Sequence, residues 1–530
     1  MRSAPLFLLP AFIPLLVSAQ NRTDLKTKVV ILGAGLTGVT AAKALALERN
    51  ITDFLIIEAL PEVGGRLKQS SIGGYPIEVG GNWIQGLGTN PIWALAQKYN
   101  VTNRYSNWSS IDYFDENGHD EGKLEEAFAK FEDDIFPKAE KISDLRQERG
   151  QIDLNFRAGL NLAGWTAQTP YEKTVEYFSF DWEYAEPPVQ SSFIQNINSF
   201  TYNFEGFGNE SNNFVYDKRG FRTVIQGQAD EIPNFNDHIL YNQTVTHVFY
   251  GSNGVNVLTA DGTLIEAEFA LCTFSIGVLQ HNDVVFEPEL PEWKKDAIAN
   301  FHMATYLKIF VQFPHQFWNK TEVSYSYYFQ PAISVNDTQF SLYADPDERG
   351  YYAVWQSLSA EGFFPGSNIL MVTLTSDQAY QAELQPESEV KDALMGVLKT
   401  MYGPNIPDPI AIKFHRWTLD PLFRGTFMNW GAGATIEQQN AIRAPIPDPD
   451  LPSPSGQRVF FAGEGTSRKY FGYLQGAYFE GRLASGLIAD CVLNGCLTTE
   501  TSAYHRRKIL GETRQKRKLV RGGLRKPVFE

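Results

Sequence analysis

A chain of 530 residues is too long for one hydrophobic core, so its length predicts at least two domains. The hydrophobic content of 43% supplies enough apolar side chains to build them, and three cysteines exclude stabilisation by a disulfide framework. The net charge of −15 hides a basic end, because residues 505–530 hold ten Lys or Arg against two Glu, and residues 1–504 therefore sum to −23. Such an acidic body can concentrate a cationic substrate, although solubility alone explains it equally well.

The first residues, MRSAPLFLLPAFIPLLVSAQ, have the pattern of a secretory signal peptide. Arg2 precedes an apolar run, and the small residues Ser18 and Ala19 suit cleavage after residue 19. A transmembrane anchor needs a longer uninterrupted apolar run, and no later segment of the sequence supplies one. We therefore expect residues 1–19 to be removed and the protein to be secreted to the extracellular space, with no membrane span.

Three further features of the sequence bear on the expected exported protein: its cysteines, its basic tail and its glycosylation sequons. Cys491 and Cys496 are near enough in sequence to pair locally, while Cys272 lies in an apolar strand and is expected to remain a buried thiol. The basic tail, residues 503–530, is predicted to be disordered, and nucleic acid is not an expected partner of an exported protein. Eight N-x-S/T sequons predict a glycoprotein: Asn21, Asn50, Asn100, Asn107, Asn209, Asn242, Asn319 and Asn336.

The stretch KVVILGAGLTGVTAAKALA, which begins at Lys28, predicts a buried strand, a glycine turn and a helix. Gly33, Gly35 and Gly38 form the pattern G-x-G-x-x-G, which allows a tight turn, close approach of backbone to a pyrophosphate and close packing of helix on strand. A second strand, DFLIIEA, ends at Glu58, twenty residues after Gly38, where a carboxylate accepts hydrogen bonds from a ribose. This order predicts a dinucleotide-binding fold.

The residues after Glu58 indicate which dinucleotide is bound. They read ALPEVGGRL, so Gly64, Gly65 and Arg66 lie one short turn beyond the ribose acid, within reach of the same diphosphate. A nicotinamide enzyme does not need this extension, because its cofactor leaves in each cycle, and we therefore expect permanently held FAD. Near the C-terminus, RVFFAGEGTS predicts a strand running into Glu464, followed by a helix whose start can direct N–H groups at a phosphate or a flavin carbonyl. A plain turn is the alternative for GEGTS.

Residues 306–314, YLKIFVQFP, predict a strand with a lysine in its middle. Alternation places Lys308 on one face with Tyr306, Phe310 and Gln312. Because lysines are almost never fully buried without a partner, periodicity alone predicts that this face is solvated. Other expected elements are strands at AVWQSL and ILMVTL, strands over 254–274 with a turn at Asp261–Gly262, and helices within 119–149 and 388–402.

Taken in order, the motifs resemble those of the flavin-containing amine oxidases: GAGLTG, GGR, EVGGNWIQG (78–86), YLKIF, GTFMNW (425–430), FFAGEGTS and GYLQGAY. The segment DWEYAEPP (181–188), interpreted as a strand and turn, is similar to the version in the secreted polyamine oxidases of plants. The resemblance implies an α/β (α+β) fold with the active site between two domains. These are a Rossmann-like FAD-binding domain (27–105, 213–306 and 420–500) and a substrate-binding domain of mixed sheet and helices (106–212 and 307–419).

The resemblance also implies roles for single residues. Lys308 matches the lysine that holds a water against the reactive flavin nitrogen. The resemblance therefore implies that the strand face with Lys308 points to the flavin and not to solvent. Phe427 and Tyr473 match aromatic residues that flank the flavin, and Trp83 matches a further wall, with ordinary core aromatics as the alternative. Val248 lies in the strand whose backbone meets adenine in the family.

Three further positions bear on substrate and cofactor. Glu186 matches an acid that lines the substrate tunnel of the plant enzymes and can pair with a distal ammonium. Gln85 departs from the family, which often has an acid or a histidine there, and an amide lacks Coulombic attraction for a polycation. Thr426 stands in a segment comparable to the one where monoamine oxidases carry the cysteine that binds FAD, so we expect noncovalent FAD.

The expected function is that of an FAD-dependent polyamine oxidase, which converts spermidine or spermine and dioxygen to an aminoaldehyde, a smaller amine and hydrogen peroxide. A related oxidase of another amine, such as a monoamine or a specialised metabolite, is the alternative that Gln85 supports. An L-amino-acid oxidase needs an arginine for the substrate carboxylate that the sequence does not identify. A flavoprotein kept only for binding would not need Lys308. No Ser/His/Asp or metal-ligand pattern competes, and a monomer is expected.

Overall fold

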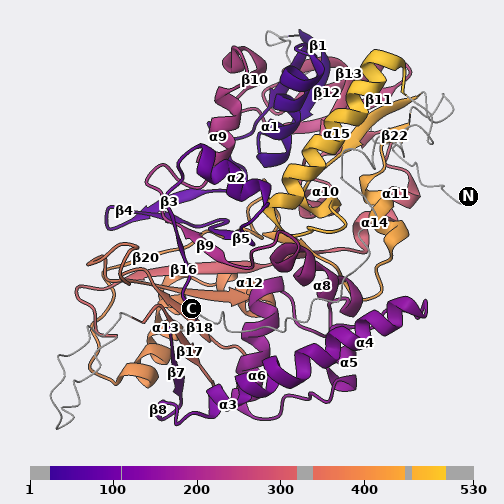
Figure 1. The fold of residues 1–530 in the computed structure, drawn as a ribbon. Coiled ribbons are helices and arrows are strands. Elements are labelled where there is room, and N and C mark those ends of the chain that lie inside the picture. The colour runs from indigo at the N-terminus through magenta and orange to yellow at the C-terminus, as the bar shows by residue number, and fades with distance from the viewer. Residues whose placement is uncertain (1–23, 109, 319–337, 448–455, 497–530) are drawn as a thin grey trace, which may run out of the picture.

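The computed structural model describes residues 24–108, 110–318, 338–447 and 456–496, which form two large β-sheets with their covering helices (Figure 1). The expected signal peptide (1–19), the basic tail (503–530) and the sequons at Asn21, Asn319 and Asn336 lie outside these residues. Within the described part of the chain, no helix is both long and apolar enough to cross a membrane.

Nine strands form the larger sheet, which lies in the upper part of Figure 1. Its central strand, β1 (Asp24–Leu32), pairs in parallel with β2 (Phe54–Ile57) on one side and with β13 (Leu264–Cys272) on the other. The first half of β13 pairs with an antiparallel meander, and its end pairs in parallel with a strand from near the C-terminus. The remaining strands are β10 (Ile239–Leu240), β11 (Val245–Gly251), β12 (Gly254–Thr259), β14 (Val285–Glu287), β22 (Ile446–Pro447) and β23 (Gln457–Phe461).

Helices cover both faces of this sheet, because β1 is apolar on both. Val29 and Ile31 belong to one buried cluster, and Val30 and Leu32 belong to another. The first cluster includes side chains of α1 (Leu36–Lys43), α2 (Pro91–Lys98), α9 (Thr223–Asp230) and α15 (Leu474–Asn494). The second includes side chains of α10 (Ile276–His281), α11 (Glu292–Ala299) and α14 (Ile436–Arg443).

Seven strands form the second sheet, in the order β20-β16-β19-β18-β17-β7-β8. β16 (Tyr306–Gln312) lies between two antiparallel partners and is buried along its length, apart from the half-buried Tyr306. The helix α13 (Glu387–Tyr402) packs with its apolar side chains against one face of the sheet. The other strands are β7 (Ile111–Asp115), β8 (Gly118–His119), β17 (Phe340–Tyr343), β18 (Val354–Ser357), β19 (Ile369–Thr375) and β20 (Ala411–Lys413).

A helical layer rich in aromatic side chains lies beside the second sheet, in the lower part of Figure 1. Its helices are α3 (Lys123–Lys130), α4 (Phe136–Glu148), α5 (Phe156–Leu162), α6 (Pro170–Glu176), α7 (Trp182–Tyr184) and α8 (Phe193–Phe200). The helix α12 (Ser376–Leu384) instead packs with the second sheet and α13. The shorter helical turns of the described chain are η1 (Ala44–Glu48), η2 (Phe131–Ile135), η3 (Tyr177–Asp181), η4 (Thr201–Glu205), η5 (Phe235–His238) and η6 (Glu464–Thr466).

Small sheets occupy the region between the two large ones. The three-stranded sheet brings together β5 (Trp83–Gln85), β9 (Asn212–Val215) and β6 (Asn103–Tyr105). Two pairs complete the set: β3 (Gln69–Ile72) with β4 (Tyr75–Glu78), and β15 (His302–Ala304) with β21 (Phe427–Asn429).

Most expected elements are confirmed, but the interpretation of DWEYAEPP as a strand and turn is wrong. The segment continues a helix that begins at Pro170 with a capping box between Thr169 and Glu172, passes through η3 and α7, and ends at Ala185 with φ +60°. The mixed α/β fold class is confirmed. The division into two domains stays a prediction; the larger sheet draws its strands from residues 24–57, 239–287 and 446–461, and the second from 111–119 and 306–413.

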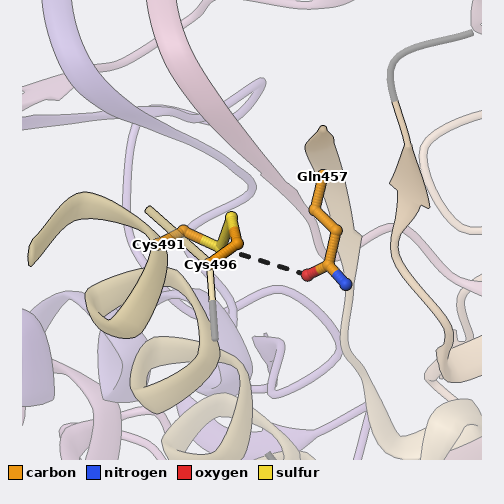
Figure 2. Close-up of a disulfide and its surroundings, with 3 residues drawn as sticks. All are labelled: Gln457, Cys491 and Cys496. Carbon is orange, nitrogen blue, oxygen red and sulfur yellow. Dashed lines mark hydrogen bonds between the residues drawn. A yellow bond between two sulfur atoms is a disulfide. The ribbon is translucent and has the colours of Figure 1, made fainter. Parts of the chain in front are cut away.

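The cysteines take the states expected from their positions. Cys491 and Cys496 form a disulfide at the end of α15, beside Gln457 of β23 (Figure 2). Cys272 is a buried free thiol at the end of β13. Burial raises its pKa to about 12, so it is not a reactive thiolate at neutral pH.

Candidate active site

One cavity of about 490 Å³ collects residues from both ends of the chain and from both large sheets. It is lined at one end by Gly33 and Gly35 of the turn after β1, and at the other by Tyr306 and Lys308 of β16. Concave sites of this kind, where separate segments converge on a few polar groups, are the usual place for a cofactor and its substrate.

The turn between β1 and α1 shows why its three glycines are needed. Gly33 has φ +110°, a conformation that L side chains rarely adopt. A Cβ at Gly38 would lie 2.0 Å from the carbonyl oxygen of Gly33, so α1 packs on the turn too closely for any side chain. A Cβ at Gly35 would meet no atom within 4 Å, which leaves bare backbone facing the cavity at the N-terminus of α1.

Glu58 follows β2 at the same end of the cavity. Its carboxylate accepts the backbone N–H of Ala34 at 2.6 Å and that of Leu60 at 2.8 Å. Burial raises the pKa of Glu58, and these backbone hydrogen bonds oppose the shift. The carboxylate is therefore fixed against the glycine turn, with the cavity beside it.

An ion pair between Arg66 and Glu464 links the N-terminal and C-terminal parts of the cavity wall. Arg66 Nη1 donates to Glu464 Oε1 and to the carbonyl oxygen of Thr426, each at 2.7 Å. The second oxygen of Glu464 accepts the N–H groups of Met428 (3.3 Å) and Gly472 (2.9 Å). Both carboxylate oxygens are thus engaged, and Glu464 holds the cavity wall together rather than offering a free side chain to a ligand.

Lys308 lies at the opposite end and is 6% exposed. Its Nζ donates to the carbonyl oxygen of Gly80 at 2.5 Å and to Asn82 Oδ1 at 2.6 Å, and lies 5.3 Å from the centre of the Trp83 ring. Burial lowers its pKa to about 7, and the negative charge of Glu78 opposes the shift. Near neutral pH this amine can therefore hold or release a proton inside the cavity.

Aromatic side chains enclose this end. The ring of Phe427 lies 5.7 Å from that of Tyr306, and Trp83 packs edge-on against Trp182 at 5.4 Å. Tyr473, the residue before α15, is 7% exposed. All five line the cavity, and their faces exclude water while tolerating an amine.

A carboxylate, Glu183, lies among these rings. Its Oε1 accepts the hydroxyl of Tyr473 at 2.5 Å and the side-chain amide of Gln85 at 3.1 Å. No described residue donates to its Oε2. Burial raises the pKa of Glu183 to about 7, and the hydrogen bond from Tyr473 opposes the shift. The cavity thus contains one carboxyl group, that of Glu183, with an oxygen that accepts no hydrogen bond from a described residue.

Comparisons with known proteins agree with this geometry. The sequence profile described as "Flavin containing amine oxidoreductase" matches residues 36–489. The chain belongs to the flavin-containing amine oxidases. Polyamine oxidase 1 of Zea mays is 33% identical to it over 533 residues, covering 95% of this chain and 99% of the relative. Polyamine oxidase 7 of Oryza sativa subsp. japonica is 34% identical over 491 residues, covering 89% and 96%.

The fold of this flavin-containing amine oxidase also matches solved structures. A putrescine oxidase double mutant, from a redesign of cofactor binding, superposes with a TM-score of 0.67 at 17% identity, covering 88% of this chain and 99% of that one. Wild-type putrescine oxidase bound to putrescine gives 0.66 at 16% identity, covering 87% and 99%. The expected architecture is therefore confirmed, and the chain is a flavin-dependent amine oxidoreductase.

The residues of this oxidase fit a flavin. Bare backbone faces the cavity at Gly35 and again at Gly463, where the atom nearest to an added Cβ would be the Phe274 carbonyl oxygen at 4.0 Å. Glu58 is placed for a ribose and the first turn of α1 for a diphosphate. Gly463, Glu464 and residues 471–474 also line the cavity, and this part of the wall suits the ring system.

Most of the residues that the sequence predicts come together in this oxidase. Those that line the cavity are Gly33, Gly35, Glu58, Gly65, Arg66, Trp83, Gln85, Lys308, Phe427, Glu464 and Tyr473. Gly38 acts through packing, as described above. The prediction from periodicity that Lys308 lies on a solvated face is wrong, because Gly80, Asn82 and Trp83 contact its amine and the residue is buried.

Besides Gly38, two predicted residues do not line the cavity. Val248 is fully buried within β11, and the cavity reaches this strand three residues earlier, at Val245. Glu186 is 8% exposed and lies behind the wall, whereas Glu183 of the same segment lines it. The acid that faces the cavity is therefore Glu183. The helix end at Ala185 separates the two acids, since Glu183 lies in α7 and Glu186 follows the helix.

Proposed function

We propose that the protein is an FAD-dependent polyamine oxidase, acting on spermidine- or spermine-type amines. The observation that carries the proposal is the free carboxylate oxygen of Glu183 in the same aromatic cavity as the buried amine of Lys308. A carboxylate is the expected partner of an ammonium group, and aromatic faces can hold the rest of a cationic chain. The similarity to plant polyamine oxidases over most of the chain supports the same substrate class.

The residues have distinct tasks in such a reaction. A bound flavin supplies a two-electron acceptor, which dioxygen reoxidises with formation of hydrogen peroxide. Glu183 binds an ammonium of the substrate, and Trp83, Tyr306, Phe427 and Tyr473 exclude water from the reacting carbon. Removal of a hydride from the carbon beside the nitrogen gives an imine, which water splits into an aminoaldehyde and a smaller amine. Lys308, with its pKa at about 7, holds a proton or a water near the reactive ring nitrogen of the flavin.

We further propose that FAD is held without a covalent bond. Of the three cysteines, two form the disulfide and the third, Cys272, is buried in the sheet and does not line the cavity. Thr426 lies in the cavity wall, and its backbone carbonyl oxygen accepts a hydrogen bond from Arg66. No described cysteine is therefore placed to attack the flavin ring.

We propose secretion on the basis of the leader sequence and the sequons. Asn50, Asn100, Asn209 and Asn242 are exposed, and Asn107 is half-buried, so each has side-chain surface at which a glycan can be attached. The disulfide between Cys491 and Cys496 suits an oxidising compartment. Detection of the protein in culture medium, with a mass that falls on removal of N-linked glycans, tests this proposal.

A second candidate is the oxidation of another amine. Gln85 presents an amide next to Glu183, so this part of the cavity carries one carboxylate where an acid at residue 85 would supply two. An L-amino-acid oxidase is disfavoured, because Arg66 is the one arginine that lines the cavity in the described chain, and it is bound to Glu464 and Thr426.

A peroxide-coupled assay separates these functions. Spermidine, spermine, their acetylated forms, putrescine, aromatic monoamines and L-amino acids are offered to the purified yellow protein, and the aldehyde is identified by mass spectrometry. The proposal predicts peroxide and an aminoaldehyde from spermidine or spermine. Turnover of monoamines alone, or of amino acids alone, would replace it with the corresponding alternative.

A further inference from the structure

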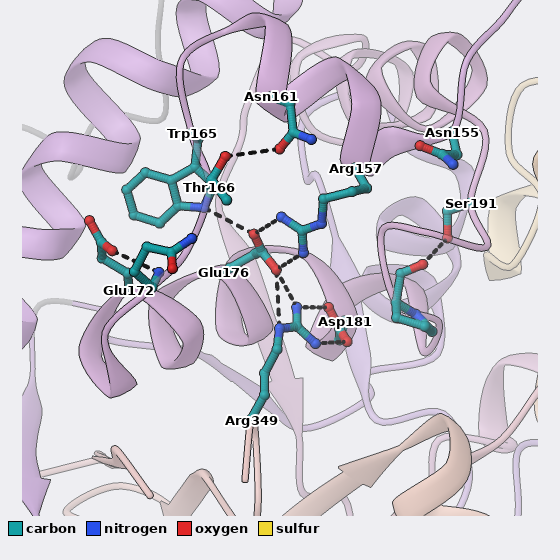
Figure 3. A network of polar contacts seen from close by, with 12 residues as sticks. Asn155, Arg157, Asn161, Trp165, Thr166, Glu172, Glu176, Asp181, Ser191 and Arg349 are labelled. Atoms are coloured by element: carbon teal, nitrogen blue, oxygen red, sulfur yellow. Dashed lines mark hydrogen bonds and ion pairs between the residues drawn. The ribbon is translucent and has the colours of Figure 1, made fainter. Parts of the chain in front are cut away.

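A buried charge cluster, defined here as Arg157, Glu176, Asp181 and Arg349, lies in the helical layer beside the cavity (Figure 3). Arg349 makes two parallel bonds to Asp181, Nη1 to Oδ2 at 2.6 Å and Nη2 to Oδ1 at 2.7 Å. Its Nε and Nη2 also bind Glu176 Oε1, at 3.1 and 2.9 Å. Arg157 binds the same carboxylate through both of its terminal nitrogens.

Both acids of the cluster are withdrawn from water. Glu176 is 0% exposed and Asp181 is 3% exposed, and Glu176 also accepts the indole N–H of Trp165 at 3.0 Å. Burial raises the pKa of Asp181 to about 6 even with Arg349 beside it. Because apolar residues of similar volume would stabilise a helical layer at least as well, a buried cluster of this kind is poorly explained by stability alone.

The cluster fixes the helical segment that carries Glu183. Asp181 ends η3 two residues before Glu183, and its carbonyl oxygen accepts the N–H of Ala185 at 2.7 Å, where the helix ends. Arg349 comes from a different part of the chain, the turn between β17 and β18. That turn is itself held by Gln378 of α12, whose Nε2 donates to the carbonyl oxygen of Arg349 at 3.1 Å.

We propose that Arg349 is a positioning residue for substrate binding, and the inference rests on the proposed role of Glu183 in binding an amine. The two parallel bonds to Asp181 fix the rotation of the helix end about its axis, because a planar guanidinium matches a carboxylate in one orientation. That rotation sets where the free Oε2 of Glu183 stands relative to Gln85 and Tyr473. Arg349 thus controls the amine site without lining the cavity.

The test uses the holoenzyme with Arg349→Lys, which keeps the charge but loses the planar fork, and Arg349→Met, which loses both. Arg157→Met is the matched control, because Arg157 belongs to the same cluster but does not bind Asp181. Each change is made alone and together with Glu183→Gln. The dissociation constant for spermidine and the limiting rate of flavin reduction are measured by anaerobic rapid mixing, and the melting temperature is recorded for every variant.

The proposal predicts that Arg349→Lys weakens spermidine binding about tenfold, a coupling typical of residues in one network, while the limiting rate changes less than about twofold. In the Glu183→Gln background the same change should weaken binding by less than about twofold. Arg157→Met should lower the melting temperature and leave binding unchanged. An equal loss of binding with and without Glu183, or an equal loss in Arg157→Met, would show a merely structural role and overturn the proposal.

Amide hydrogen exchange of the holoenzyme without substrate separates this proposal from the proposed function. Peptides covering residues 177–184 should exchange faster in Arg349→Lys and Arg349→Met than in Arg157→Met. Unchanged exchange there in both Arg349 variants would overturn the positioning role, whatever the substrate is. Faster exchange in a protein that oxidises no polyamine would support the cluster's control of the helix end and reject the proposed substrate class.

Discussion

Replacing Glu183 by glutamine tests the substrate site most sharply. The amide keeps the shape of the side chain, and its oxygen can still accept the hydrogen bonds from Tyr473 and Gln85. What changes is the free position, where an N–H group replaces the oxygen that would accept from an ammonium. A hydrogen bond to a charged group contributes about 1.5–3 kcal/mol, so we expect the KM and dissociation constant for spermidine to rise about 10- to 150-fold.

The pH dependence of spermidine binding tests the role of the Glu183 charge independently. Burial raises the pKa of Glu183 to about 7, so the carboxylate is mostly protonated at pH 6 and mostly ionised at pH 8. Substrate amines with a pKa of about 10 remain charged throughout this range. Binding should therefore strengthen about tenfold between pH 6 and 8 in the wild type, and the change should be smaller in Glu183→Gln. The assay is an anaerobic titration of the flavin absorbance with spermidine at each pH.

Glu186→Gln is the matched control for this experiment. Glu186 lies in the same segment but behind the wall, and burial raises its pKa to about 8, so its carboxyl is largely neutral at pH 7. An amide there should leave KM within about twofold. If Glu186→Gln raises KM as much as Glu183→Gln, or if Glu183→Gln binds spermidine normally, the assignment of Glu183 as the amine partner is wrong.

Three further predictions follow from the cavity. Lys308→Met should remain folded and yellow but slow flavin reduction or reoxidation at least about 100-fold, as for loss of a proton-handling group; rates equal to wild type in stopped-flow traces would refute its role. Glu464→Ala removes the hydrogen-bond partner of Arg66 and of two backbone N–H groups, so the binding free energy of FAD should weaken by about 2 kcal/mol or more in a reconstitution titration. Unchanged FAD affinity would show that the contacts of Glu464 do not shape the site. Denaturation and filtration should release all of the yellow colour, whereas colour retained on the polypeptide would contradict noncovalent FAD.

The dinucleotide-binding half of the site could be predicted from the sequence because its residues are close in the chain. Gly33, Gly35, Gly38 and Glu58 belong to one strand–turn–helix–strand unit, where each residue's task follows from local geometry. The disulfide was also predictable, since Cys496 is only five positions after Cys491.

The substrate half depends on long-range packing that no local pattern contains. The burial of Lys308 follows from Gly80, Asn82 and Trp83, which lie far earlier in the chain and contact its amine, and alternation cannot show what covers a face. Glu183 was missed because DWEYAEPP alternates like a strand, whereas the capping box at Thr169 starts a helix that continues into it. The adenine contact expected at Val248 stays a prediction, and the cavity reaches β11 only at its start, at Val245.

Anaerobic mixing of the purified protein with single amines tests the central claim most directly. In the absence of dioxygen, a substrate of the enzyme bleaches the flavin absorbance and the colour returns when dioxygen is admitted. The structure and the proposed function predict bleaching by spermidine or spermine at a rate that Lys308→Met and Glu183→Gln reduce. A fully flavin-loaded protein that none of spermidine, spermine and their acetylated forms can bleach would contradict the proposed polyamine oxidase activity.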